Sequence, residues 1–329
     1  MLKTIRRIHC LLLGTAALAT AVSLGSASSV AQNQSVAQNK NETKIVATFL
    51  PIYMFTKGVT GESGKVELLI PAGADPHDYQ ATPENARSIA EADVLVKNGL
   101  GLEEFLEKLV DATANSRLQE IDASQNIEPL EEEDKDHDDH DDHDDHDHDH
   151  DHDHDHGHHH EEGNPHVWLD PVLAQQQVKN IRDGLIQANS NNEATYRANA
   201  DIYIRKLQEL HQEFQTRLSP FQGCKFIAFH DAYPYLAKRY NLQQMAVVEL
   251  PQDNITPRDV QRVIKAAKEY QVKGLLAEVG FNDNRMQQIA KDIRLPIKNL
   301  DPINSGSLDS EYYFTAMRNN LKSLEEVCQ

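Results

Sequence analysis

Histidines are the residues of this sequence with the clearest potential for chemistry, and they fall into two groups. Twelve of the 17 histidines lie in one short segment, where they are interspersed with carboxylates. These twelve are His137, His140, His143, His146, His148, His150, His152, His154, His156, His158, His159 and His160. His77, His166 and His230 lie apart from them, each in a different part of the chain. Because neutral imidazole is a preferred nitrogen ligand of Zn²⁺, both groups predict metal binding.

The contexts of the three separate histidines predict that they meet. His77 follows a predicted strand over residues 66–70, and His230 ends another predicted strand. His166 lies directly before a predicted helix. Loops at the carboxyl ends of parallel strands gather at one edge of a sheet, so the three side chains can converge between two lobes. A single histidine is more often structural or exposed, and we keep that interpretation for His211, which lies within a long helical pattern.

Carboxylates near these histidines offer further ligands or hydrogen-bond partners. Asp301 follows the last predicted strand and can supply the fourth ligand, unless water completes the site or the carboxylate only caps the following loop. Asp75, Asp78, Asp170 and Asp231 flank the histidines. They can accept hydrogen bonds from the second ring nitrogens or simply cap turns, and the sequence leaves both roles open.

The negative charge of the chain is concentrated in one segment. The sequence has 52 acidic and 32 basic residues, a formal net charge of −20, which excludes a general nucleic-acid binder because phosphate contacts need basic clusters. Residues 131–162 hold 18 carboxylates and one lysine, together with the twelve clustered histidines. Such a segment has nothing apolar to bury, so we expect a disordered loop that binds several Zn²⁺ ions weakly. The loop would collect, buffer or sense zinc, and a merely solubilising acidic loop is the alternative.

The amino-terminal segment has the layout of a secretory signal peptide. Three basic residues precede an apolar run over residues 11–24, and small residues follow it. A transmembrane anchor needs about 20 apolar residues, more than this run provides. We therefore expect residues 1–31 to be removed and the mature protein to be periplasmic, with residues 32–43 as a flexible tether.

The three cysteines are too few for a disulfide scaffold and lack the CxxC spacing of a redox pair or a zinc ribbon. Cys10 lies in the predicted signal peptide with no apolar stretch before it, so we expect no lipid anchor. Cys224 and Cys328 stay in the mature chain and can form a disulfide in an oxidising compartment. Two buried thiols are the alternative.

Predicted strands and helices alternate in two series. The first series has strands at residues 44–49, 66–70, 94–97 and 118–121, and helices at residues 51–59, 83–90 and 102–111. The second series has strands at residues 225–229, 245–249, 274–278 and 297–300, and helices at residues 233–240, 257–270, 284–293 and 312–327. Alternation of this kind predicts mostly parallel sheets with helices on both faces.

Two predicted helices lie between the series. One covers residues 171–188, and the other covers residues 193–218, where apolar residues recur at spacings of three and four. The predicted fold class is α/β, with two lobes that each hold a mostly parallel sheet flanked by helices. One long linking helix, residues 192–219, would join a first lobe, made of residues 44–130 and 163–191, to a second lobe, residues 220–329, with a cleft between the lobes.

Three segments resemble the metal-binding family of ABC-transporter solute-binding proteins. Residues 71–103 begin with PAGADPHDY and include EADVLVKNGLGLE. Residues 164–171, NPHVWLDP, and residues 229–233, FHDAY, are similar to the second and third ligand segments of that family. The resemblance runs from about residue 44 to the end of the chain. It implies two α/β lobes joined by a long helix, a metal ion between them and an inner-membrane ABC permease as the partner.

The ligand types within this resemblance favour zinc. Manganese-selective members resemble the chain but tend to carry a carboxylate where it has His230, and nitrogen ligands favour Zn²⁺ over Mn²⁺. Cys224 departs from some zinc members, which place the partner of their terminal cysteine elsewhere. We predict a monomeric periplasmic protein that captures Zn²⁺ between its lobes and delivers it to the permease. A manganese- or iron-binding member of the family is the alternative.

Two other kinds of protein share the same set of ligands. Three histidines with an open fourth position also describe a catalytic zinc site, so a zinc hydrolase is an alternative of a different class. The sequence contains neither HExxH nor GxSxG, and we predict no enzymatic activity. An adhesin or an extracellular metal buffer would use the same site without a permease.

Overall fold

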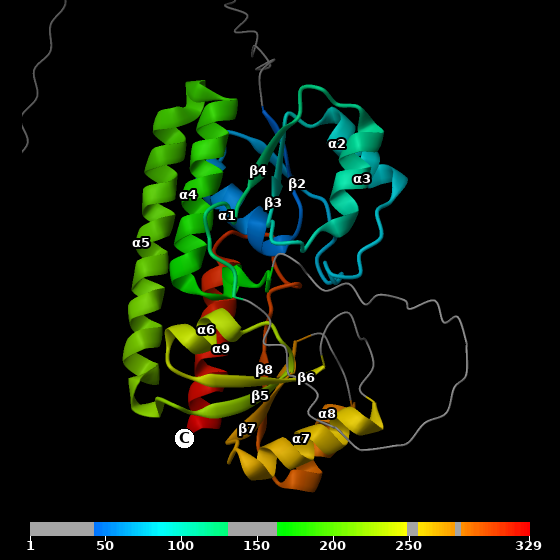
Figure 1. Ribbon diagram of the computed structural model, residues 1–329. Helices are drawn as coiled ribbons and strands as arrows, with labels where there is room; N and C mark the ends of the chain where they lie inside the picture. The colour runs from blue at the N-terminus through cyan, green and yellow to red at the C-terminus, as the bar shows by residue number, and fades with distance from the viewer. Residues whose placement is uncertain (1–42, 131–162, 249–255, 280–283) are drawn as a thin grey trace, which may run out of the picture. The chain divides into compact units, whose positions relative to one another are not determined.

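The computed structural model describes residues 43–130, 163–248, 256–279 and 284–329 (Figure 1). The predicted signal peptide, most of the predicted tether and the whole His-rich segment at residues 131–162 lie outside these ranges. None of the helices in the described residues is long and apolar enough to cross a lipid bilayer.

The first lobe is built on a four-stranded parallel sheet with the strand order β2-β1-β3-β4. Its strands are β1 (Lys44–Ala47), β2 (Lys65–Leu68), β3 (Val94–Lys97) and β4 (Gln119–Asp122). Its helices are α1 (Leu50–Thr60), α2 (Pro83–Glu91), α3 (Glu104–Thr113) and α4 (Pro171–Ala188). A proline occupies the first turn of α1, α2 and α4, where its missing N–H is not needed.

The second lobe repeats this arrangement with the strand order β6-β5-β7-β8, again parallel throughout. Its strands are β5 (Lys225–His230), β6 (Gln243–Val248), β7 (Gly274–Glu278) and β8 (Ile297–Leu300). Its helices are α6 (Pro234–Arg239), α7 (Pro257–Glu269), α8 (Asn284–Ile293) and α9 (Tyr312–Cys328). The predicted α/β class with two parallel sheets is confirmed, and the predicted element boundaries differ from these by a few residues at most.

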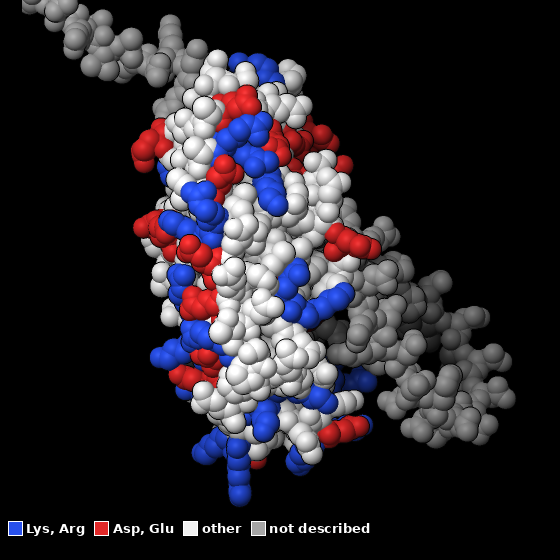
Figure 2. All heavy atoms as spheres, turned by 90° about the vertical axis from the view of Figure 1, so that its left-hand side faces the viewer, with Lys and Arg blue, Asp and Glu red and all other residues white. Residues whose placement is uncertain are grey.

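The long helix α5 (Glu193–Leu218) has 26 residues, as predicted, and extends along both lobes (Figure 1). At 1.5 Å per residue it is roughly 39 Å long. Its buried residues recur every three or four positions: Tyr196, Ala200, Tyr203, Ile204, Leu207, Leu210, Phe214 and Leu218. Figure 2 views the molecule from the side of α5 and shows basic and acidic side chains interleaved there. Some charged side chains of α5 form ion pairs, such as Arg197 with Glu193 at 2.8 Å.

The two lobes share a large hydrophobic cluster, and each lobe has a smaller buried cluster of its own. A single cluster of buried side chains joins residues of the first lobe, such as Phe49 and Phe55, to Tyr233 and Tyr313 of the second. The ring centroids of Phe55 and Tyr313 lie 4.9 Å apart, and the ring planes meet at 68° in an edge-to-face contact. The lobes therefore contact each other through packed apolar surface, and a wide hinge opening would expose that surface to water.

A disulfide joins Cys224, directly before β5, to Cys328 at the end of α9, with 5.8 Å between the two Cα atoms. The predicted pairing is confirmed in the structure. The bridge attaches the terminal helix to the first strand of the second sheet, across a sequence separation of 104.

Removing this bridge is expected to lower the free energy of unfolding substantially. A closed loop of about 100 residues corresponds to about 4.7 kcal/mol in the chain-entropy model, which is an upper figure. Denaturant unfolding of the Cys224→Ser, Cys328→Ser double variant against the parent measures the loss. Unfolded, non-reduced mature protein should contain no free thiol from this pair, and two free thiols per chain would contradict the bridge.

Candidate metal centre

Three elements from the two lobes bring three histidines together. His77 lies in the loop after β2, His166 precedes a short 3-10 turn (Val167–Leu169) that leads into α4, and His230 is the last residue of β5. His166 and His230 are buried, and His77 is half-buried. The three offer ligand atoms that all lie within 4.8 Å of one another. Among the described residues, they are the one group of three or more His, Cys, Asp or Glu side chains close enough together to hold a metal ion.

The distances between ring nitrogens match those of a metal site. His166 Nε2 lies 3.1 Å from His77 Nε2 and 3.2 Å from His230 Nε2. Two nitrogens bound to one tetrahedral Zn²⁺ at 2.0–2.1 Å are separated by about 3.3–3.4 Å. The three Nε2 atoms are therefore placed to bind one small cation after shifts of a few tenths of an ångström.

Hydrogen bonds on the far side of two rings determine where their protons lie. Nδ1 of His166 lies 3.0 Å from Asn164 Oδ1, and Nδ1 of His230 contacts Glu278 Oε1. An amide oxygen and a carboxylate accept hydrogen bonds, so each Nδ1 carries the proton and donates. In the neutral rings both Nε2 atoms then present lone pairs to each other at 3.2 Å. That arrangement is repulsive until a cation, or a proton in its place, lies between them.

A hydrogen bond from the loop after β3 holds the segment that carries His166. Asn98, in the loop after β3, is fully buried and donates through Nδ2 to Pro165 O at 3.0 Å. The next residue, Gly99, has φ +84°, and a Cβ there would lie 2.4 Å from Asp122 Oδ1. A glycine is therefore required at this position, because only it permits both the backbone conformation and the close approach.

Asp301 has a structural role in the loop after β8. It is buried, and its Oδ1 accepts a hydrogen bond from Ile303 N at 2.7 Å while Tyr312 Oη lies 3.4 Å from its Oδ2. This is the loop cap that the sequence left open as the alternative. The group of histidines within 4.8 Å, among the described residues, does not include Asp301, and its role as a fourth ligand stays a prediction.

Three of the flanking aspartates, Asp75, Asp170 and Asp231, accept hydrogen bonds from groups other than the histidine rings. Asp75 accepts from the backbone N–H of His77 at 3.0 Å, and Asp170 caps α4 and pairs with Arg239 at 2.8 Å. Asp231 accepts from Gln244 Nε2 at 2.6 Å.

Asn164 and Glu278, which we did not predict from the sequence, accept from the Nδ1 atoms of His166 and His230. A signal for Glu278 was present, because it ends β7, the neighbour of β5 in the sheet.

Neighbouring carboxylates also affect the charge of His230. Burial lowers its pKa, but the negative charge of Glu278 and the hydrogen bond to it act in the opposite direction. Asp75 and Asp231 add to this effect, so the pKa is raised above its ordinary value of 6.5. Without metal, a proton on His230 Nε2 can therefore take the position between the rings.

This competition predicts the pH dependence of zinc binding. Because the pKa of His230 is raised, the apparent zinc affinity should begin to fall once the pH drops below that pKa, which lies above 6.5. At lower pH each zinc ion must displace one proton from His230, so the affinity should fall about tenfold per pH unit. Competition titrations with a zinc chelator of known pH dependence, between pH 5 and 8.5, measure this profile. A flat profile down to pH 6 would contradict the prediction.

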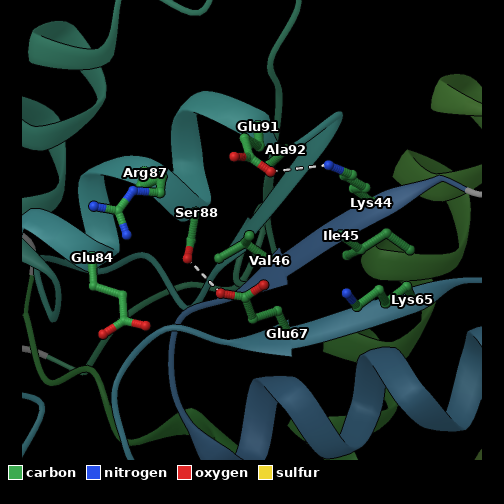
Figure 3. A pocket seen from close by; sticks show the side chains of 10 residues that line it. All are labelled: Lys44, Ile45, Val46, Lys65, Glu67, Glu84, Arg87, Ser88, Glu91 and Ala92. Atoms are coloured by element: carbon green, nitrogen blue, oxygen red, sulfur yellow. Dashed lines mark hydrogen bonds and ion pairs between the residues drawn. The ribbon is translucent and has the colours of Figure 1, made fainter.

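Other candidate features of the chain lie apart from the three histidines. His211 on α5 lies 3.1 Å, through Nδ1, from the hydroxyl oxygen of Tyr240, which supports the structural interpretation. A small cavity of about 130 Å³ lies on the first lobe, beside β1, β2 and α2 (Figure 3). Two pairs of its lining side chains interact: Lys44 with Glu91 at 3.1 Å, and Ser88 with Glu67. None of the three histidines lines this cavity.

Known proteins resemble the chain over almost all of the described residues. The family model described as the periplasmic component A of the zinc-uptake complex matches residues 45–327. The zinc-binding lipoprotein AdcA of Streptococcus pneumoniae strain R6 is 33% identical over 294 residues, which cover 86% of this chain and 55% of AdcA. The high-affinity zinc uptake system protein ZnuA of Bacillus subtilis is 32% identical over 287 residues, which cover 86% of each protein.

A solved structure extends this similarity to three dimensions. The crystal structure of Zn(II)-bound AdcA from Streptococcus pneumoniae has a TM-score of 0.71 at 28% identity and covers 87% of this chain and 58% of that chain. The chain thus spans about half the length of its pneumococcal relative and most of the length of its Bacillus relative.

Proposed function

Since this chain belongs to the family of the periplasmic component A of zinc-uptake complexes, we propose that it captures Zn²⁺ with His77, His166 and His230 and delivers it for uptake. The observation that carries the proposal is the convergence of the three Nε2 atoms. In the neutral rings two of them present lone pairs to each other at 3.2 Å, an arrangement that a bound cation, or a proton in its place, stabilises. Family members and relatives are zinc-binding transport proteins, so the chain belongs with binding proteins and not with zinc hydrolases.

The ligand set supports zinc over the alternative metals. Three neutral imidazoles form a nitrogen-rich, compact site, whereas Mn²⁺ prefers oxygen ligands and a higher coordination number. Water or Asp301 would complete the four ligands. Each carboxylate oxygen of Asp301 already accepts one hydrogen bond, from Ile303 N or from Tyr312 Oη, and keeps a second lone pair that could bind the metal.

The location and the partner follow from the proposed role. A predicted signal peptide at residues 1–31 would direct the protein to the periplasm, where a monomer would dock on an inner-membrane ABC permease. The pneumococcal relative is named a lipoprotein, whereas we predict no lipid on Cys10. Phase partition of the processed protein between detergent and water separates a lipid-anchored form from a diffusing one.

We also propose the division of the chain that the sequence predicted. The first lobe would be residues 44–130 and 163–191, the linking helix residues 192–219 and the second lobe residues 220–329. The parallel sheets of the described residues support this division, and each lobe has a buried cluster of its own beside the cluster that the two lobes share.

A metal competition experiment tests the function. The mature protein lacking residues 131–162 should bind one equivalent of Zn²⁺ tightly and should prefer it to Mn²⁺ in direct competition. Zinc-loaded protein should then support zinc uptake by vesicles that contain the cognate permease. Preference for Mn²⁺, or turnover of ester, peptide or phosphoester substrates by the zinc-loaded protein, would contradict the proposal.

Deleting residues 131–162 is expected to remove only weak zinc binding. Imidazoles among many carboxylates attract several cations, but the three proposed ligands lie outside this segment. Calorimetric titration of the intact and deleted proteins should show one tight equivalent in both, with additional weak equivalents in the intact protein alone. Loss of the tight equivalent would mean that the segment supplies a primary ligand.

A further inference from the structure

Asn164 connects one proposed zinc ligand to the opposite lobe. Its Oδ1 accepts from the backbone N–H of His166 at 3.1 Å and from His166 Nδ1 at 3.0 Å. Its Nδ2 donates to the backbone carbonyl of Asp231, in the second lobe, at 2.8 Å. This last bond determines the orientation of the amide, because the NH₂ group must face the carbonyl oxygen and the amide oxygen must face the imidazole.

The backbone of Asn164 is held from the second lobe as well. The hydroxyl of Tyr235, on α6, donates to Asn164 O at 2.6 Å and accepts from Leu130 N at 2.9 Å. Asn164 N in turn donates to Leu130 O at 3.0 Å. Asn164 is 3% exposed and Tyr235 is 5% exposed, so water competes little for these bonds. One hydroxyl group of the second lobe therefore holds two loop segments of the first lobe, at Leu130 and at Asn164, beside the proposed metal centre.

We infer that Asn164 and Tyr235 are positioning residues that make the orientation of His166 depend on contact with the second lobe. While Asp231 and Tyr235 hold Asn164, the His166 ring keeps its proton on Nδ1 and directs Nε2 at the metal. When that local contact separates, the ring loses its orienting acceptor and the site loses a well-placed ligand. Zinc release to a partner then requires the opening of this contact alone, and the shared apolar core stays packed. The inference rests on the proposed function.

The hydroxyl of Tyr235 can be removed with little other change. In the full mature chain, Tyr235→Phe is expected to speed zinc release to an excess of chelator by about tenfold, and Asn164→Ala to weaken zinc affinity by about 10- to 100-fold. Both variants should also alter the visible absorption of the Co²⁺-substituted protein, because a displaced imidazole changes the ligand field.

Tyr203→Phe is the matched control. Tyr203 on α5 is 3% exposed, and its hydroxyl donates to Ser310 O at 2.9 Å, so this variant also loses a buried hydrogen bond. It should lower thermal stability as Tyr235→Phe does, while its zinc release rate and Co²⁺ spectrum stay those of the parent.

The inference is overturned if Tyr235→Phe and Asn164→Ala release zinc at the parent rate, or if Tyr203→Phe changes release and spectrum as much as they do. These outcomes differ from a failure of the proposed function, in which the parent itself binds no zinc tightly.

Discussion

Replacing His166 by alanine is expected to weaken zinc binding by roughly 100- to 1,000-fold in protein that lacks residues 131–162. Structural zinc sites with four ligands have apparent binding free energies of about 10–16 kcal/mol, so one ligand in four corresponds to about 2.5–4 kcal/mol. His166 is the central one of the three proposed ligands, with its Nε2 within 3.2 Å of both other Nε2 atoms. The buried site offers no small shift that would replace it, and His77→Ala and His230→Ala should have effects of the same order.

Competition with a chromophoric chelator at constant pH measures these affinities. His211→Ala is the control, because His211 is the other histidine of the described residues and contacts Tyr240 instead of the site. It should bind zinc as the parent does. If all three site variants bind zinc with the parent affinity, the assignment of the ligands is wrong.

Removing the carboxylate of Glu278 is expected to weaken zinc binding by about 10- to 100-fold, although Glu278 is not a proposed ligand. Its Oε1 accepts the Nδ1 proton of His230, which directs Nε2 at the metal and increases the electron density that the ring offers. Both residues are buried, at 4% and 5% exposure, so water does not replace the lost acceptor. Glu278→Gln keeps an oxygen acceptor without the charge and should fall between the parent and Glu278→Ala.

A second readout identifies the cause of this loss. The Glu278 variants lose the main interaction that raises the pKa of His230, so their zinc affinity should decline at a lower pH than that of the parent. Glu213→Gln removes a carboxylate that pairs with Arg217 and Arg318, and it controls for the change in net charge. Parent affinity in Glu278→Ala would exclude the positioning role, and an equal loss in Glu213→Gln would indicate a general charge effect.

Residue pattern alone predicted the elements and their class. The 26-residue span of α5 follows from apolar residues at spacings of three and four, which a helix places on one face. The parallel sheets follow from the alternation of strands and helices. These are local properties of the sequence, and they need no knowledge of which segments meet in space.

The positions of the three histidines were predictable for a related reason. His77 and His230 follow or end strands, and carboxyl ends of parallel strands gather at one edge of a sheet. Residue type then restricted the chemistry, because imidazole nitrogen favours zinc.

The partners of those histidines were decided by tertiary structure. The sequence offered neighbouring aspartates as acceptors, but Glu278 reaches His230 from 48 positions away, because β7 lies beside β5 in the sheet. Asn164 became the acceptor of His166 because Asp231 and Tyr235 of the other lobe fix its orientation.

Sequence therefore determined which residues form each helix and strand and which residue types can bind zinc, since periodicity and ligand chemistry are local. The packing of the two lobes against each other decided the rest: the orientation of the rings and the coupling of His166 to the second lobe. Each of these depends on distances between segments far apart in the chain, and only burial against a shared core sets such distances to the few tenths of an ångström that a hydrogen bond requires.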